Sequence, residues 1–204
     1  QVTGLLWNTQ GDDAQRKYDY RYDRAKRLLN ANFTEQQHIG DGWSSAKMDF
    51  SVSGVSGQIN YDLNGNLLTM LQKGVIAGGS SPLTVDDLRY NYAPLKNKLE
   101  SVTDQMTVTA SNGQSGDFKD GANGTNPDYV YDDNGNVVID LNKNAQSLNN
   151  GAPGTNGIKY NHLDKPEEIR IVGKGTIKIV YSADGEKLQR NYTPERGAVS
   201  ITSY

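Results

Sequence analysis

The chain has 204 residues and a formal net charge of −3, and 35% of its residues are hydrophobic. It contains 22 Gly and 12 Tyr, which favours many short strands and turns over packed helices. The absence of Cys excludes disulfides, thiol catalysis and thiolate metal sites. The small net charge predicts no nucleic-acid partner. No apolar run approaches the ~18 residues that span a bilayer, so no membrane insertion is expected. Because residue 1 is Gln, we expect a mature or excised product.

Six β-hairpins are predicted along the chain. Residues 61–71 read YDLNGNLLTML, and residues 131–141 read YDDNGNVVIDL. Asn-Gly accepts the positive φ angles of a tight turn whose twist suits the strands that it joins. We expect hairpins near residues 17–33, 58–72, 88–103, 128–142, 158–172 and 176–192, anchored on the last aromatic residue of each first strand: Tyr22, Tyr61, Tyr92, Tyr131, His162 and Tyr181.

The anchors recur at a regular distance. Two sets of them are spaced by 70 residues, namely Tyr22, Tyr92 and His162, and Tyr61 and Tyr131. Two hairpin types therefore alternate, and only the last interval is shorter. In the last hairpin, Asp184-Gly185 takes the place of Asn-Gly.

The predicted fold class is all-β, with one antiparallel sheet of roughly 10 to 14 short strands that continues as a single segment over residues 1–204. Side chains alternate across a strand, so Tyr18, Tyr20 and Tyr22 share one face and charged residues take the other. Twist accumulated over so many strands predicts a curved sheet. Residues 74–82, 111–127 and 142–157 are predicted to be loops, and short helical turns are expected at most at 12–17 and 85–88.

The repeated pattern resembles the Rhs and YD-repeat proteins, whose unit is a tyrosine-aspartate strand, a turn with Gly and an apolar return strand. The resemblance covers nearly the whole chain and rests on these residues: Tyr22-Asp23, Tyr61-Asp62 with Gly65, and Tyr131-Asp132 with Gly135. The opening GLLWNTQG and the segment FKDG at residues 118–121 look like the Bacteroidetes type of cell-wall-associated Rhs protein. Three hairpins depart from the pattern, with Ala93, Leu163 and Ser182 in the aspartate position.

This resemblance implies a long β-sheet strip that spirals into a hollow shell, often around a C-terminal toxin. The expected function is therefore a non-catalytic wall segment of a secreted or surface protein. Its expected partners are the rest of its own shell and a C-terminal effector domain. Because an isolated wall segment has open strand edges, we also expect edge-to-edge self-association or an edge covered by a loop.

The Asp-x-Asn-Gly sequences resemble the start of a calcium loop, but neither is followed by the bidentate Glu that such a loop requires. We therefore interpret Asp62 and Asp132 as turn acceptors, with no metal and no cofactor.

The tyrosines could stack on sugars or pack across strands, and packing is favoured. Carbohydrate binding through exposed aromatic residues is the alternative function, with Trp7 and Trp43 as the expected glycan contacts because both lie outside the hairpins. For catalysis, only His38 and His162 could act as a base near neutral pH, and no nucleophile, zinc or phosphate motif is present. We therefore predict no enzyme. The basic residues of 16–27 alternate with aspartates, which indicates a solvated mixed face.

Overall fold

The computed structural model describes residues 1–38, 40–75, 81–106, 118–121, 127–149 and 152–204. Within these ranges the regular structure consists of strands, and the paired strands are antiparallel. The prediction of an all-β antiparallel fold is therefore confirmed. There are seventeen strands in these ranges, more than expected, because several have only two to four residues. The chain divides into unit 1 (Gln1–Lys98 and Val102–Phe118) and unit 2 (Leu99–Ser101 and Lys119–Tyr204).

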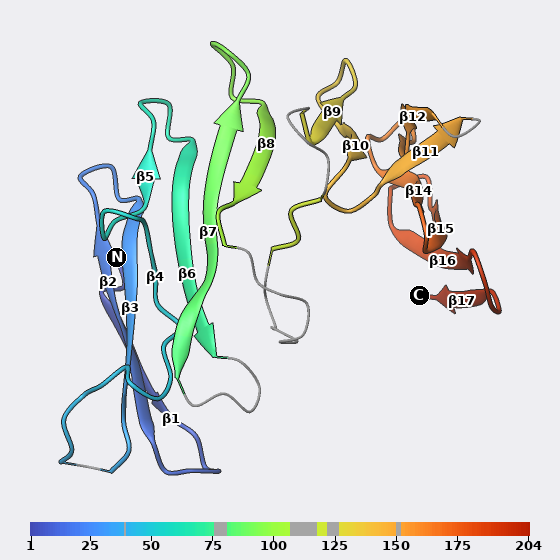
Figure 1. Cartoon of the computed structure of the whole chain (residues 1–204). Coiled ribbons are helices and arrows are strands. Elements are labelled where there is room, and N and C mark those ends of the chain that lie inside the picture. Colours follow the sequence, from blue (N-terminus) through green and yellow to red (C-terminus); the bar gives the residue numbers. More distant parts are fainter. Residues whose placement is uncertain (39, 76–80, 107–117, 122–126, 150–151) are drawn as a thin grey trace. The chain divides into compact units, whose positions relative to one another are not determined.

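Unit 1 is built on a sheet with the strand order β1-β2-β3-β4-β6-β7-β8, and β5 pairs with β6 (Figure 1). The strands are β1 (Gly4–Asn8), β2 (Gln15–Tyr22), β3 (Leu28–Gln36), β4 (Val52–Ser53), β5 (Asn60–Tyr61), β6 (Leu67–Val75), β7 (Pro82–Tyr92) and β8 (Leu99–Asp104), of which residues 99–101 belong to unit 2. The turns that follow β2, β5 and β7 lie at the same end of the sheet in Figure 1.

The short helical turns expected in unit 1 are not formed. Residues 15–17 begin β2, and residues 85–88 lie inside β7. Val85 and Leu88 are buried in the sheet at 3% and 5% exposure. Strand pairing therefore overrides the weak local helical preference.

One part of the core of unit 1 is a cluster of aromatic rings around Phe33, which is 1% exposed. Its ring centroid lies 5.4 Å from those of Tyr18 and Phe50 and 6.1 Å from that of Trp7. Tyr20 stacks on Tyr18 with centroids 5.7 Å apart, so these tyrosines share a face as predicted. Offset and edge-to-face pairs of this kind add to the free energy of simple burial.

The described residues of unit 2 form three smaller sheets. The first pairs β9 (Tyr129–Tyr131) with β10 (Val137–Asp140), and the second pairs β11 (Gln146–Asn149) with β12 (Ala152–Asn156). The third has the order β13-β14-β15-β16-β17, formed by β13 (Ile158–Tyr160), β14 (Pro166–Ile171), β15 (Gly175–Tyr181), β16 (Lys187–Pro194) and β17 (Ser200–Ser203).

Two expectations need correction. Residues 142–157 were predicted to be a loop, but they contain the β11–β12 hairpin. The described strands also form four sheets rather than one continuous sheet. Between β10 and β13 the reason is local, because after β10 the chain turns back on itself with a bridge between Asp140 and Ala145 and then inserts this extra hairpin. The predicted loops at 74–82 and 111–127 lie largely outside the described residues.

The five-stranded sheet of unit 2 carries a predominantly apolar face and a polar face. Ile169 lies opposite both Ile158 and Ile177, and all three are half-buried. Glu168, on the other face, lies opposite Lys159 and Lys178. The predicted period of two is therefore present in these strands, as expected for a sheet with one apolar side.

Candidate functional site

The most regular feature of the structure is a hydrogen bond that joins each hairpin to the strand before it. In each case a tyrosine at the end of a first strand donates its hydroxyl to a backbone carbonyl. The six bonds are Tyr22 to Val2 (2.8 Å), Tyr61 to Leu28 (2.8 Å), Tyr92 to Leu67 (3.0 Å), Tyr131 to Leu99 (2.8 Å), Tyr160 to Val137 (2.9 Å) and Tyr181 to Pro166 (3.0 Å). We call them the cross-hairpin tyrosine bonds.

The acceptors of these bonds occupy equivalent positions. Leu28 faces Tyr22 across its own hairpin, and it accepts the hydroxyl of Tyr61. Leu67 in turn faces Tyr61 and accepts from Tyr92. Val137 and Pro166 repeat this arrangement in unit 2. Four tyrosines thus bind the residue that faces the preceding tyrosine, so the same geometry can be repeated; they are Tyr61, Tyr92, Tyr160 and Tyr181.

The anchor predicted at His162 is wrong, because Tyr160 makes the cross-hairpin bond of this hairpin. His162 is exposed in the turn that follows β13. Asn161 takes the aspartate position, since its N–H binds the carbonyl of Lys165 (2.9 Å), as Asp62 binds Asn66. An amide side chain can replace the carboxylate in such a turn. The pair Tyr160-Asn161 was therefore the sequence signal, and the equal 70-residue spacing was misleading by two residues.

The turn after each anchor explains the aspartate of the repeat. In the second hairpin, Asp62 Oδ1 accepts the N–H of Asn66, and Oδ2 accepts its side-chain amide, both at 2.8 Å. The Asp62 N–H binds the Asn66 carbonyl, and the Gly65 N–H binds the Asp62 carbonyl. Gly65 has a φ of +91°, which Gly adopts at little steric cost. The predicted turn is therefore formed, with Asp62 as the acceptor and Gly65 at the positive φ.

The same side-chain acceptor recurs along the chain. Five residues accept the N–H of the residue four positions later: Asp23, Asp62, Asp132, Asn161 and Ser182. Ala93 has no such acceptor, and its turn is one residue longer. The fourth turn residue has a positive φ at Gly65, Gly135 and Gly185, and also at Lys26 and Asp164.

Hydrogen bonding favours the ionised form of Asp62 and Asp132. Burial alone would raise the pKa of Asp62, but hydrogen bonds from Asn66, Asn64 and Gly65 outweigh it and lower the pKa. The pKa of Asp132 is lowered in the same way. Both oxygens of each carboxylate are thus engaged within the turn. In the part of the chain that the structure describes, no cluster of three or more His, Cys, Asp or Glu could hold a metal ion.

A second set of contacts joins successive turns and was not foreseen from the sequence. The side chain that ends one turn reaches the next one. Arg27 donates to the carbonyl of Asp62 (3.1 Å) and lies over the Tyr61 ring (4.7 Å). Lys165 does the same with the Gly185 carbonyl (2.6 Å) and the Tyr181 ring (5.7 Å). A cation over an aromatic face adds to the hydrogen bond.

Amide side chains also join one turn to the next. Asn66 donates to Asn97 at 2.9 Å, and Asn136 donates to Asp164 at 3.0 Å. Within each unit, neighbouring hairpins are thus joined at both the tyrosine and the turn. This arrangement fixes the spacing of the hairpins.

The two tryptophans lie in different surroundings. Trp7 is half-buried and stacks on Tyr18 with ring centroids 5.7 Å apart. Trp43 is 39% exposed, and the Lys17 ammonium lies 4.9 Å from its ring centroid. Neither residue lines a described cavity. Trp7 therefore packs within the core, and Trp43 keeps an accessible ring.

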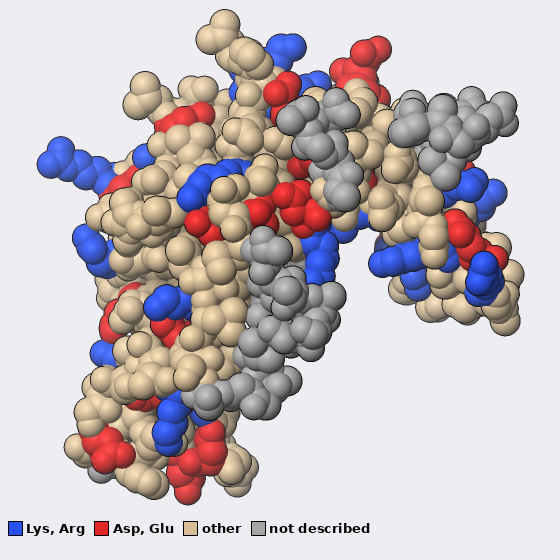
Figure 2. Space-filling view, viewed as in Figure 1, with Lys and Arg blue, Asp and Glu red and all other residues tan. Residues whose placement is uncertain are grey.

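Three ion pairs form within the charged segment at residues 12–27. Arg27 contacts Asp23 at 2.6 Å, Lys17 contacts Asp19 at 2.9 Å, and Arg16 pairs with an acid four residues earlier. On the face shown in Figure 2, basic and acidic side chains are interspersed. The predicted mixed face is therefore present in this segment.

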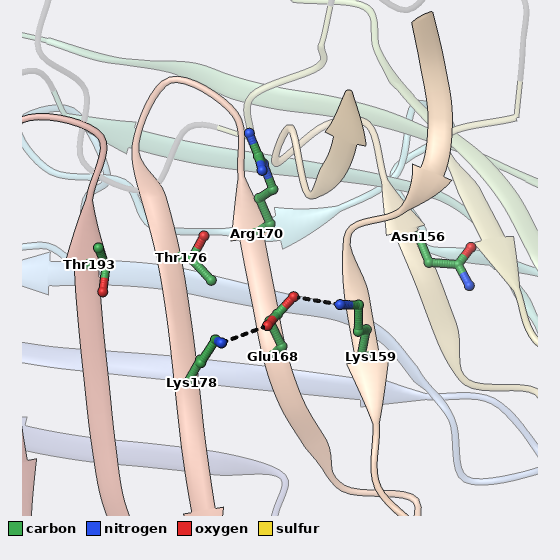
Figure 3. Close-up of a pocket in the computed structure, with 7 residues that line it drawn as sticks. All are labelled: Asn156, Lys159, Glu168, Arg170, Thr176, Lys178 and Thr193. Atoms are coloured by element: carbon green, nitrogen blue, oxygen red, sulfur yellow. Dashed lines mark hydrogen bonds and ion pairs between the residues drawn. The ribbon is translucent and has the colours of Figure 1, made fainter. Parts of the chain in front are cut away.

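One polar cavity of about 440 Å³ lies on the five-stranded sheet (Figure 3). Glu168 stands between Lys159 (2.8 Å) and Lys178 (3.3 Å). The hydrogen bond from Lys159 is the main cause that lowers the pKa of Glu168. The lining is completed by Asn156, Arg170, Thr176 and Thr193. Three cations and one carboxylate give this cavity a net positive charge.

The two histidines lie apart from this cavity. The backbone N–H of His38 donates to Asp41 Oδ2 at 3.0 Å. Neither His38 nor His162 lines a described cavity. A further cavity of about 510 Å³ is lined by Gly173, Lys174, Tyr192, Pro194, Glu195 and Arg196.

The described residues contain no helix that is long and apolar enough to cross a membrane. A scan of the chain against protein-family models finds no match, and a search of the curated proteins finds none either.

Proposed function

We propose that the chain is a structural wall segment of a secreted or cell-surface protein of the Rhs/YD-repeat type. In this role it carries no catalytic site. Its hairpins form part of a curved shell that encloses or presents a C-terminal effector. The observation that supports this proposal best is the set of six equivalent cross-hairpin tyrosine bonds.

These bonds suit a wall because they define a unit that can be repeated. Each hairpin supplies a hydroxyl to the strand before it and a carbonyl to the hairpin after it. Stability then becomes a sum of hairpin and nearest-neighbour terms, as in other repeat proteins. The half-buried apolar face of the five-stranded sheet also suits one layer of a wall better than the centre of a two-layer domain.

The test is electron cryo-microscopy of the natural gene product that contains residues 1–204. We expect the hairpins to lie in a closed wall around a lumen, and a protease to leave any enclosed domain intact. A structure in which both faces of the sheets are open to bulk solvent and no lumen exists would contradict the proposal.

A second candidate is carbohydrate binding, which the polar cavity of Figure 3 favours. Threonine hydroxyls and an amide can bind sugar hydroxyls, and the Arg170 guanidinium can pair with a uronic acid carboxylate. Titration with oligogalacturonate should then shift NMR signals of residues 168–178, and Arg170→Ala should abolish the shifts. A matched neutral oligosaccharide is the control. Equal responses to both sugars, or none, would exclude this cavity as an acidic-glycan site.

A further inference from the structure

Two edge strands carry no charged side chain: β1, at one edge of the eight-stranded sheet, and β17, at one edge of the five-stranded sheet. They read GLLWN and SITS. Leu5 and Leu6 on β1 are 52% and 61% exposed, and Ile201 on β17 is 64% exposed. Edge strands of soluble proteins are usually protected by charges, prolines or bulges. Two uncharged edges with exposed apolar side chains therefore indicate strand pairing with a partner.

The strand β17 occupies the place of a first strand in the repeat. The N–H of Tyr204, directly after β17, binds the carbonyl of Leu188 at 3.1 Å. The N–H of Tyr20 on β2 binds the carbonyl of Thr3 at 2.9 Å in the same way. Leu188 follows Lys187, which faces the anchor Tyr181 across its hairpin. Thr3 follows Val2, which accepts the hydroxyl of Tyr22. Both carbonyls therefore lie one residue after the position that accepts a cross-hairpin tyrosine bond. Tyr204 is therefore equivalent to Tyr20.

The strand β1 occupies the place of a return strand. Val2 accepts the Tyr22 hydroxyl just as Leu28 accepts that of Tyr61. In the first hairpin, Tyr20 faces the residue three positions after Leu28. By the same rule, Tyr204 would face the residue three positions after Val2, which is Leu5. The two edges are thus the two complementary halves of one hairpin.

The free backbone groups of the two edges agree with this register. In an antiparallel pair, alternate residues point their N–H and C=O groups to opposite sides. Since Tyr204 bonds to β16, the groups of Ser203 and Ile201 point outward. Since Tyr20 bonds to Thr3, the groups of Leu6 and Asn8 point outward from β1. The register places Ser203 opposite Leu6 and Ile201 opposite Asn8, so outward groups meet outward groups.

We propose that β17 of one copy pairs antiparallel with β1 of a second copy, with Tyr204 opposite Leu5. The interface joins two different surfaces, so the chains assemble head to tail. This assembly requires only the hairpin geometry and holds whether or not the chain belongs to a shell.

The first test blocks one edge at a time. Ser203→Pro and Leu6→Pro each remove an N–H that points away from the sheet of its own copy. An edge strand tolerates proline at such a position, because no hydrogen bond within the sheet is lost. In sedimentation velocity, the native chain should associate with rising concentration, each proline variant alone should stay monomeric, and their equimolar mixture should stop at a dimer. The control, Ser203→Ala, keeps the N–H and should associate like the native chain.

Three results of this experiment would overturn the proposal: association of Leu6→Pro alone, which would mean that β17 pairs with itself; no association of the mixture; or a native chain that stays monomeric at every concentration.

Cysteine cross-linking tests the register without proline, because the chain has no native Cys. A mixture of Leu5→Cys and Tyr204→Cys should form a mixed disulfide under mild oxidation, since facing residues bring the two Cβ atoms within bonding range. The mixture of Leu5→Cys with Ser203→Cys is the control, because those side chains point to opposite faces. Equal yields from the two mixtures would contradict the proposed register.

Discussion

The hydroxyl of Tyr61 offers the sharpest test of the cross-hairpin tyrosine bonds. Its strand β5 has only two residues and pairs with β6, so the bond to the Leu28 carbonyl at 2.8 Å is a large part of what holds Tyr61 in place. Tyr61→Phe keeps the ring but removes this bond. A neutral hydrogen bond contributes about 1 kcal/mol net, and an unpaired buried carbonyl costs about 1–3 kcal/mol. Because the site is only partly buried, we expect the free energy of unfolding of unit 1 to fall by about 1–2 kcal/mol.

The assay is urea unfolding followed by tryptophan fluorescence. The chain has two tryptophans, Trp7 and Trp43, and both lie in unit 1, so the signal reports that unit. Tyr20→Phe is the matched control, because no hydrogen bond of the Tyr20 hydroxyl is present among the described residues, and we expect it to change stability by at most about 0.5 kcal/mol. Equal losses for Tyr61→Phe and Tyr20→Phe would refute the reasoning.

Three further predictions follow from the turns and the buried hydroxyls. Gly65→Ala should cost unit 1 about 1 kcal/mol in the same assay because of its φ of +91°, whereas Gly11→Ala, whose added Cβ would meet nothing within 4 Å, should cost less than half as much. Burial raises the pKa of Tyr160, so its contribution to stability is complete below the unfolded value of about 10 and is lost as pH rises through the folded value. Unfolding followed by circular dichroism should show this loss, and the loss should be smaller in Tyr160→Phe. The lowered pKa of Asp132 acts in the opposite direction: its contribution is complete above the unfolded value near 4 and is lost as pH falls through the folded value. In the same measurement, Asp132→Asn should therefore reduce the loss of unfolding free energy at acidic pH. An unchanged loss at acidic pH would contradict the role of Asp132 in the turn.

The sequence predicted what depends on local periodicity. Alternation placed Tyr18 and Tyr20 on one face, where they stack at 5.7 Å. Asn-Gly predicted the turn at Gly65, whose φ is positive. Both follow from backbone geometry within a few residues.

What the sequence could not predict depends on contacts between hairpins. The hydroxyl of Tyr61 reaches a carbonyl 33 residues away, and no local pattern encodes that pairing. Equal spacing favoured His162 over Tyr160, because Asn161 stands where other hairpins carry aspartate and so hides the Tyr-Asp signature. The Gly- and Asn-rich composition of residues 142–157 hid a short hairpin. Trp7 was separated from the hairpins by its position in the sequence, yet it packs on Tyr18.

Hydrogen exchange in Tyr160→Phe shows whether a tyrosine hydroxyl joins two neighbouring hairpins. Tyr160 on β13 donates to Val137 on β10, and these strands belong to different sheets, so sheet pairing cannot replace the lost bond. We expect faster amide exchange in residues 129–140 as well as in β13, and no change at either place in the control His162→Phe. Faster exchange confined to β13, or equal effects of the two substitutions, would show that the tyrosine hydroxyls do not join the hairpins.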